Sequence, residues 1–97
     1  MEKKIYIIYT YCYEKCGDCD YNNEEIVGVF DELNLAIENA NKLGEKLYLE
    51  NNSEILPESD LFTLDNWKNN EIYIVNDEYE ENVVYIDDYE LNKMQEF

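Results

Sequence analysis

The apolar positions of this chain follow two periods, one typical of strands and one typical of a helix. β-Branched and aromatic residues dominate residues 3–11, 24–30, 71–77 and 82–91, which predicts a strand at each place. The first of these segments is apolar on both faces, so we expect a central strand that is covered on one side and lined with tyrosines on the other. Residues 12–23 are polar and rich in cysteine and turn-forming residues, which predicts a long loop between the first two strands.

The helical period follows the second strand. Apolar and small residues recur at helical spacing and predict a helix over about residues 32–49: Leu33, Ala36, Ile37, Ala40, Leu43, Gly44 and Leu47. Asp31 is the expected N-cap, and the small residues let the helix lie close to a sheet. Gly28 predicts a bulge in the second strand or a close approach by this helix. Residues 50–70 contain Pro57 and predict an irregular linker, with a short helical or extended piece that packs Trp67 over the edge of the core.

The element order β-β-α-β-β predicts an α+β fold, with an antiparallel sheet of about four strands and one main helix packed on one face. The strand order stays open, because this element order admits more than one pairing. A chain of 97 residues supports one domain over 1–97, with a radius of gyration of roughly 13 Å. With 45% hydrophobic residues and ten tyrosines, folding is favoured over disorder.

Charge excludes several classes of function. The chain has 24 acidic residues, seven basic residues that are all lysine, and no histidine, for a formal net charge of -17. Such a surface repels DNA, RNA and anionic membranes, so we expect no direct nucleic-acid or membrane partner. Histidine-based acid–base chemistry and arginine clamps on phosphate are excluded by composition. Neither acidic loop has the spacing of a calcium site, and no carboxylate pair stands out. We therefore expect no enzyme and no catalytic residue.

The ends of the chain and the cysteine content bear on location. The apolar stretch IYIIYTY after MEKK is too short and too polar for a signal peptide, and the longest apolar runs fall far below a membrane span. An odd number of cysteines argues against a secreted disulfide framework. We expect a cytoplasmic protein.

Three cysteines form the one cluster of metal-ligating type. Cys12, Cys16 and Cys19 have the spacing C-x3-C-x2-C, which resembles the cluster loop of radical-SAM enzymes. The chain is too short for the partial barrel of such enzymes, and their glycine-rich cofactor segment does not follow. Zinc, with Asp18 or Asp20 as a fourth ligand, is a second interpretation. The favoured interpretation is free thiols without a cofactor, whose pKa values the acidic neighbours raise. A small zinc, iron–sulfur or redox module remains the alternative function.

The acids are concentrated in the second half of the chain. Residues 49–97 carry fourteen acids and two lysines, against ten acids and five lysines in residues 1–48. A soluble small domain needs a net charge of about 2–8 in magnitude, so this excess favours a surface that binds a basic protein. Interleaved tyrosines suit such a surface because they supply contact area and stack on guanidinium groups. We expect the last hairpin to make the contacts, with Tyr79 and Tyr85 as anchors: Asp77, Glu78, Tyr79, Glu80, Glu81, Tyr85, Asp87 and Asp88.

By size and composition the chain resembles the small acidic anti-restriction and anti-CRISPR proteins of bacteriophages, several of which mimic DNA. The segments IYIIYTYCYE and EEIVGVFDELNLAIENA also loosely resemble small uncharacterised domains of low-GC bacteria and their phages. The first resemblance implies an inhibitor that occupies the nucleic-acid groove of a host defence nuclease, such as a Cas or restriction enzyme, in the cytoplasm of the host cell. It implies no particular residue, because those proteins share no common motif.

Overall fold

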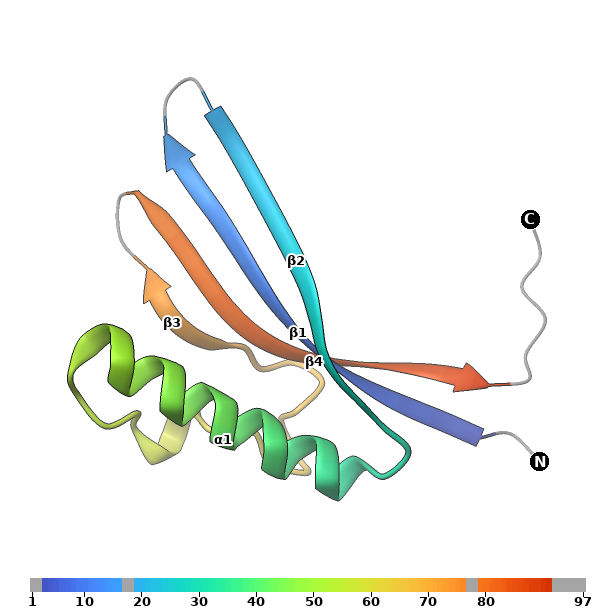
Figure 1. Ribbon diagram of the computed structural model, residues 1–97. Coiled ribbons are helices and arrows are strands. Elements are labelled where there is room, and N and C mark those ends of the chain that lie inside the picture. Colours follow the sequence, from blue (N-terminus) through green and yellow to red (C-terminus); the bar gives the residue numbers. More distant parts are fainter. Residues whose placement is uncertain (1–2, 17–18, 77–78, 92–97) are drawn as a thin grey trace.

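The computed structural model describes residues 3–16, 19–76 and 79–91, and it contains the predicted order of elements (Figure 1). In chain order these are β1 (Lys3–Cys16), β2 (Cys19–Phe30), α1 (Leu33–Asn52), the 3-10 helix η1 (Glu58–Asp60), β3 (Ile72–Asn76) and β4 (Glu80–Leu91). The strands form one antiparallel sheet of order β2-β1-β4-β3, and α1 packs on one of its faces. The predicted α+β fold is confirmed.

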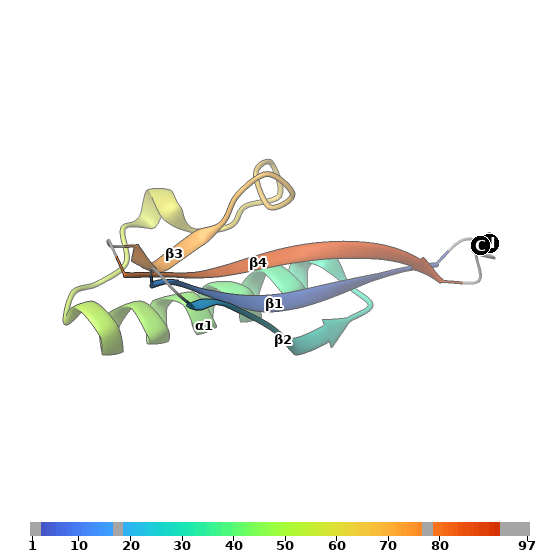
Figure 2. The ribbon, with the colours of Figure 1, turned by 90° about the horizontal axis from the view of Figure 1, so that it is seen from above.

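The two faces of the sheet have different surroundings. Tyr6 and Ile8 of β1 face α1, whereas Ile7 and Tyr9 face the opposite way, as alternation along a strand requires. Figure 2 looks onto the face away from α1, which we call the open face, and no other described element covers it. The prediction of a first strand covered on one side and lined with tyrosines on the other is confirmed. The open face carries Ile7, Tyr9, Tyr11, Glu24, Ile26, Val29, Tyr73, Glu81, Val83, Tyr85, Asp87 and Tyr89.

The core lies between the sheet and α1. It contains Ile8, Ala40, Leu56, Phe62, Ile72, Ile74, Val84 and Ile86. Asn41 on α1 fixes the linker to this core, because its amide donates to the Phe62 carbonyl at 3.0 Å and accepts from the Phe62 N–H at 2.8 Å. The amide of Asn52 donates to the Ile74 carbonyl at 2.8 Å and holds the end of α1 against β3.

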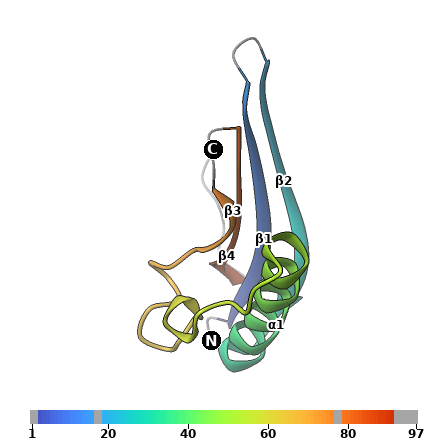
Figure 3. The same cartoon turned by 90° about the vertical axis from the view of Figure 1, so that its left-hand side faces the viewer.

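The predicted loop over residues 12–23 is wrong. β1 continues to Cys16 and β2 begins at Cys19, so the two strands are paired almost to the end of the hairpin. Pairing with β4 on the other side of β1 also continues, as far as Glu14 opposite Glu80. The segment is polar because this part of the hairpin projects past α1 and needs no apolar face (Figure 3). The projection also explains a radius of gyration of 14.9 Å, above the roughly 13 Å expected.

Gly28 marks a bulge, as predicted. Ile8 pairs with Gly28 and Tyr9 pairs with Ile26, so Val27 is an extra residue on β2. The close approach at this glycine comes from a ring and not from the helix, since a Cβ there would lie 2.8 Å from Cε2 of Phe30.

Both ends of α1 differ from the prediction. The N-cap is Glu32 and not Asp31, because the Glu32 carbonyl accepts the first helical bond, from the Ala36 N–H. At the other end α1 runs three residues past the predicted Leu49. Ser53 then ends it in a left-handed conformation, with φ 56°, and donates its N–H to the Leu49 carbonyl.

The linker prediction is confirmed. Residues 53–71 contain the short helix η1 and a series of turns. Trp67 packs against the core, with its ring centroid 5.6 Å from that of Tyr6 in an edge-to-face arrangement. The linker therefore closes the end of the core that α1 leaves uncovered.

Candidate protein-binding surface

Three tyrosines form a row on the open face. Tyr9 and Tyr85 lie directly opposite each other on β1 and β4, with ring centroids 5.0 Å apart and planes 14° from parallel. The hydroxyl of Tyr9 lies 3.2 Å from that of Tyr89, which is four residues beyond Tyr85 on β4. Stacking and hydrogen bonding together hold these side chains in one arrangement, so the surface is ordered before any partner arrives.

The row is joined to a carboxylate. The hydroxyl of Tyr85 donates a 2.6 Å hydrogen bond to Oε2 of Glu24 on β2. Burial, this hydrogen bond and the Glu24 charge raise the pKa of Tyr85 above its ordinary value. The hydrogen bond with Tyr89 and burial raise the pKa of Tyr9 to about 12. Both phenols therefore stay neutral at physiological pH and keep their hydrogen atoms for these bonds.

Apolar side chains on the open face are exposed to an unusual degree. Ile26 is 61% exposed and Val29 is 56% exposed, although both lie on a strand of the sheet. Tyr73 and Tyr89 are also exposed, whereas Ile7 and Val83 are buried between their neighbours. Apolar patches bordered by polar groups mark interaction sites more often than solvated surfaces.

Carboxylates border this apolar area. Glu24 lies on β2, and Glu81 and Asp87 lie on β4. Glu81 and Asp87 occur six positions apart on one strand face, so their Cα atoms are separated by about 20 Å at roughly 3.4 Å per residue. The open face therefore combines exposed rings with negative charges about 20 Å apart on one strand.

The predicted contact residues do not share one face. Glu81, Tyr85 and Asp87 lie on the open face, whereas Glu80 and Asp88 point to the side of α1. Tyr79 precedes β4 and is exposed. Asp77 and Glu78 lie outside the described residues.

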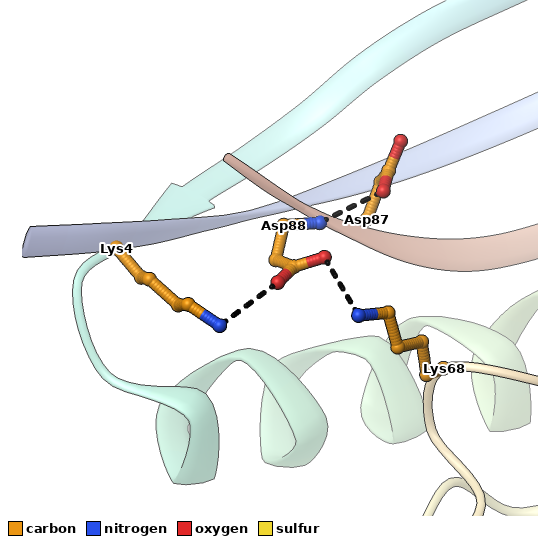
Figure 4. Close-up of polar contacts among 4 residues, drawn as sticks. All are labelled: Lys4, Lys68, Asp87 and Asp88. Atoms are coloured by element: carbon orange, nitrogen blue, oxygen red, sulfur yellow. Dashed lines mark hydrogen bonds and ion pairs between the residues drawn. The ribbon is translucent and has the colours of Figure 1, made fainter. Parts of the chain in front are cut away.

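Asp88 has local cation partners. Its Oδ2 atom lies 3.5 Å from the Lys4 ammonium and its Oδ1 atom lies 3.7 Å from the Lys68 ammonium (Figure 4). The Asp88 side chain is only 14% exposed. The neighbouring Asp87 carboxylate points the other way and accepts the backbone N–H of Asp88 at 2.9 Å. Adjacent acids thus have different surroundings: Asp88 holds the fold together, and Asp87 faces outward.

The cysteines lie on the hairpin formed by β1 and β2. Cys12 is half-buried on β1, and Cys16 and Cys19 are backbone partners at the ends of the two strands. The side chains of Cys16 and Cys19 lie outside the described part, so the three-cysteine metal site stays a prediction. Within the described residues no three metal-ligating side chains come together. Burial and the charges of Glu80 and Glu14 raise the pKa of the Cys12 thiol, which keeps this thiol protonated.

Several residues of the open face were missed by sequence reasoning. The segment YTYCY contained the signal for Tyr9, because Tyr9, Tyr11 and Tyr13 recur at every second position. Tyr89 lies four residues after Tyr85, a spacing that places both on one face of the last strand. Glu24 and Val29 had none, since their place beside β1 depends on the register and on the bulge at Val27.

Comparison of this chain with protein-family models, with curated proteins and with solved structures found no match. No helix among the residues described here has the length and apolar character needed to cross a membrane.

Proposed function

We propose that this chain is an acidic protein-binding module that acts as an inhibitor of a nucleic-acid-binding protein. The partner is a nuclease with a basic groove, such as a Cas or restriction enzyme. The chain occupies this groove in place of DNA, in the cytoplasm of a phage-infected cell. The supporting observation is the open face, where an ordered tyrosine row lies among carboxylates in a chain of net charge -17.

Charge supplies the attraction. With 24 acidic residues and seven lysines, at least seventeen carboxylates have no cation of this chain to balance them. Duplex DNA presents a negative charge about every 1.7 Å along its axis, and proteins bind it through lysine and arginine. An acidic surface with outward carboxylates such as Glu81 and Asp87 attracts the same side chains and raises the rate of association.

Tyrosines supply contact area. Tyr85 and Tyr89 lie beside Asp87 on one strand face, so an arginine that approaches the carboxylate meets a ring at the same time. The stack with Tyr9 and the bond to Glu24 fix the Tyr85 ring in advance. A fixed ring loses little conformational entropy when a partner binds, which favours affinity.

Affinity capture tests the proposal. The tagged chain is incubated with a nuclease-treated lysate of a bacterium that has CRISPR and restriction systems, and bound proteins are eluted with a salt step and identified by mass spectrometry. We expect retention of one nucleic-acid enzyme, which duplex DNA or guide-loaded target then displaces. A mixture of ribosomal and other basic proteins that elute together at modest salt would show that the charge acts without specificity.

Matched charge variants locate the contact. Glu81→Lys with Asp87→Lys reverses two charges on the open face, and Glu45→Lys with Glu50→Lys reverses two exposed charges on α1. Both variants change the net charge equally. We expect the first to lose the captured enzyme and the second to keep it. Equal retention by both variants would remove the open face as the site of contact.

A further inference from the structure

A second surface lies on the other side of the sheet. Where β1 and β2 project past α1, an open groove of about 380 Å³ separates the helix from the strands. Its apolar wall consists of Leu43 and Leu47 on α1 and Val27, Ile74 and Val84 on the sheet. Val27, the extra residue of the bulge, is 47% exposed there. Pockets of this size and composition accommodate small molecules or several side chains of a partner.

Carboxylates surround the groove. Glu25 lines it beside Asn23, whose amide donates to the Glu25 carboxylate at 3.3 Å. Glu14 and Glu80 lie directly opposite each other on β1 and β4, on the same face as the groove residue Cys12. Both of these charges contribute to the raised pKa of the Cys12 thiol, so their electrostatic effect reaches into the groove.

Glu14, Glu25 and Glu80 lie on the groove side of the sheet, in a chain of net charge -17. The groove therefore combines apolar walls with a field that favours positive charge.

We propose that this groove binds a basic amphipathic segment of a partner protein, whose apolar side chains fill the space between Val27, Leu43 and Leu47 while its lysines or arginines pair with Glu14, Glu25 and Glu80. Charge complementarity selects this occupant. Another copy of the same chain carries a net charge of -17 and would bring further carboxylates against these three. The carboxylates of this surface, Glu14, Glu25 and Glu80, lie on the opposite face of the sheet from Glu81 and Asp87.

A titration with a defined peptide tests the proposal. The ¹⁵N-labelled chain is titrated with a synthetic amphipathic helical peptide made only of leucine and lysine, and amide shifts are followed by NMR. We expect the largest shifts at Val27, Leu43, Leu47 and Asn51, all of which line the groove. Shifts confined to the open face, or no saturable binding, would overturn the proposal.

Charge variants provide the matched control. Glu25→Lys with Glu80→Lys reverses two charges beside the groove, and Glu81→Lys with Asp87→Lys reverses two on the open face. We expect the first variant to weaken peptide binding at least about tenfold and the second to change it less than about threefold, because screening limits the effect of distant charges. Equal weakening of peptide binding by both variants would show that net charge alone attracts the peptide, and this result would overturn the proposal. Capture of the nucleic-acid enzyme is tested at Glu81 and Asp87, whereas peptide binding in the groove is tested at Glu25 and Glu80. Either proposal can therefore fail while the other holds.

Two valines test the apolar part without any change of charge. Val27 lines the groove and Val29 lies on the open face, and both are about half exposed on β2. We expect Val27→Asn to weaken binding of the leucine–lysine peptide and Val29→Asn to leave it unchanged. Two further results would overturn the proposal. One is equal binding of a leucine–serine peptide of the same pattern, and the other is the same groove shifts when the chain is concentrated without peptide.

Discussion

A 2.6 Å hydrogen bond joins Tyr85 on β4 to Glu24 on β2, two strands that are not neighbours in the sheet. β1 runs between them, and its Tyr9 ring stacks on the ring of Tyr85. The hydroxyl of Tyr85 therefore reaches across a whole strand, over the open face. Three strands of the sheet are linked by side chains at this point, in addition to their backbone ladders.

Loss of this bond will lower stability by a measurable amount. Tyr85→Phe removes the donor, and Glu24→Gln leaves a neutral acceptor in place of the charged one. A double-mutant cycle with urea denaturation should give a coupling free energy of about 1 kcal/mol, the usual size for a partly exposed hydrogen bond to a charged group. Additive effects of the two substitutions would show that the charge of Glu24 adds nothing to this bond in solution.

The tyrosine row also makes stability depend on alkaline pH. The folded chain raises the pKa of Tyr9 to about 12 from its ordinary value of 10.0. Between these pH values the unfolded chain loses this proton and the folded chain keeps it, so the free energy of unfolding falls as pH rises. We expect stability from this group to be fully present below about pH 10 and to be lost by about pH 12.

Absorbance of tyrosinate measures this effect directly. The chain has ten tyrosines, and Tyr9→Phe should remove from the absorbance curve a component with a midpoint at about 12. Tyr13→Phe, on the same strand, is the control and should leave that component in place. Because the pKa of Tyr85 is raised as well, Tyr9→Phe keeps a late component from Tyr85. A titration curve that Tyr9→Phe leaves unchanged would contradict the role given to the Tyr9–Tyr89 contact.

Asp88 should stabilise the fold even though the chain carries excess negative charge. Asp88→Asn removes a largely buried carboxylate from between Lys4 and Lys68, and we expect a loss of about 1 kcal/mol, since both lysines are half exposed and partly screened. The exposed pair of Glu38 and Lys42 on α1 supplies the control. Glu38→Gln should change stability by no more than about 0.3 kcal/mol. A gain in stability for Asp88→Asn in thermal melts would mean that net charge outweighs the pair.

Salt should stabilise the chain as a whole. A net charge of -17 repels itself in the compact state, and added ions screen this repulsion. We expect the melting temperature to rise by several degrees between about 20 mM and 0.5 M NaCl, which corresponds to about 1 kcal/mol for a domain of this size. Glu45→Lys with Glu50→Lys makes the net charge less negative, so its melting temperature should rise less with added salt. A melting temperature that falls with salt would show that local ion pairs such as that of Asp88 dominate.

The sequence predicted the fold more completely than the surface. Alternation and helical spacing each follow from local residues, so the strands, α1 and the position of Trp67 could be predicted. The loop over residues 12–23 was mispredicted because strands that project past a core lose their apolar pattern. The strand register is needed to assign Glu81 and Asp87 to the open face and Glu80 and Asp88 to the side of α1. Glu24 reaches Tyr85 only because of the strand order.

Gly44 of α1 packs closely against Ile72 of β3, because a Cβ at Gly44 would lie 2.8 Å from Cδ1 and 3.3 Å from Cγ2 of Ile72. Helix propensity alone favours Gly44→Ala by about 1 kcal/mol. Ile72 is fully buried and cannot move aside, so we expect a net loss of about 1–2 kcal/mol from overpacking.

A compensating change distinguishes this cause from others. Ile72→Val removes the Cδ1 atom that the new methyl group would meet. Alone it should cost about 1 kcal/mol through a small cavity. Combined with Gly44→Ala it should recover part of the loss, so that the double variant is more stable than the sum of the two single changes predicts. Strict additivity in urea denaturation would show that α1 and β3 do not approach this closely in solution.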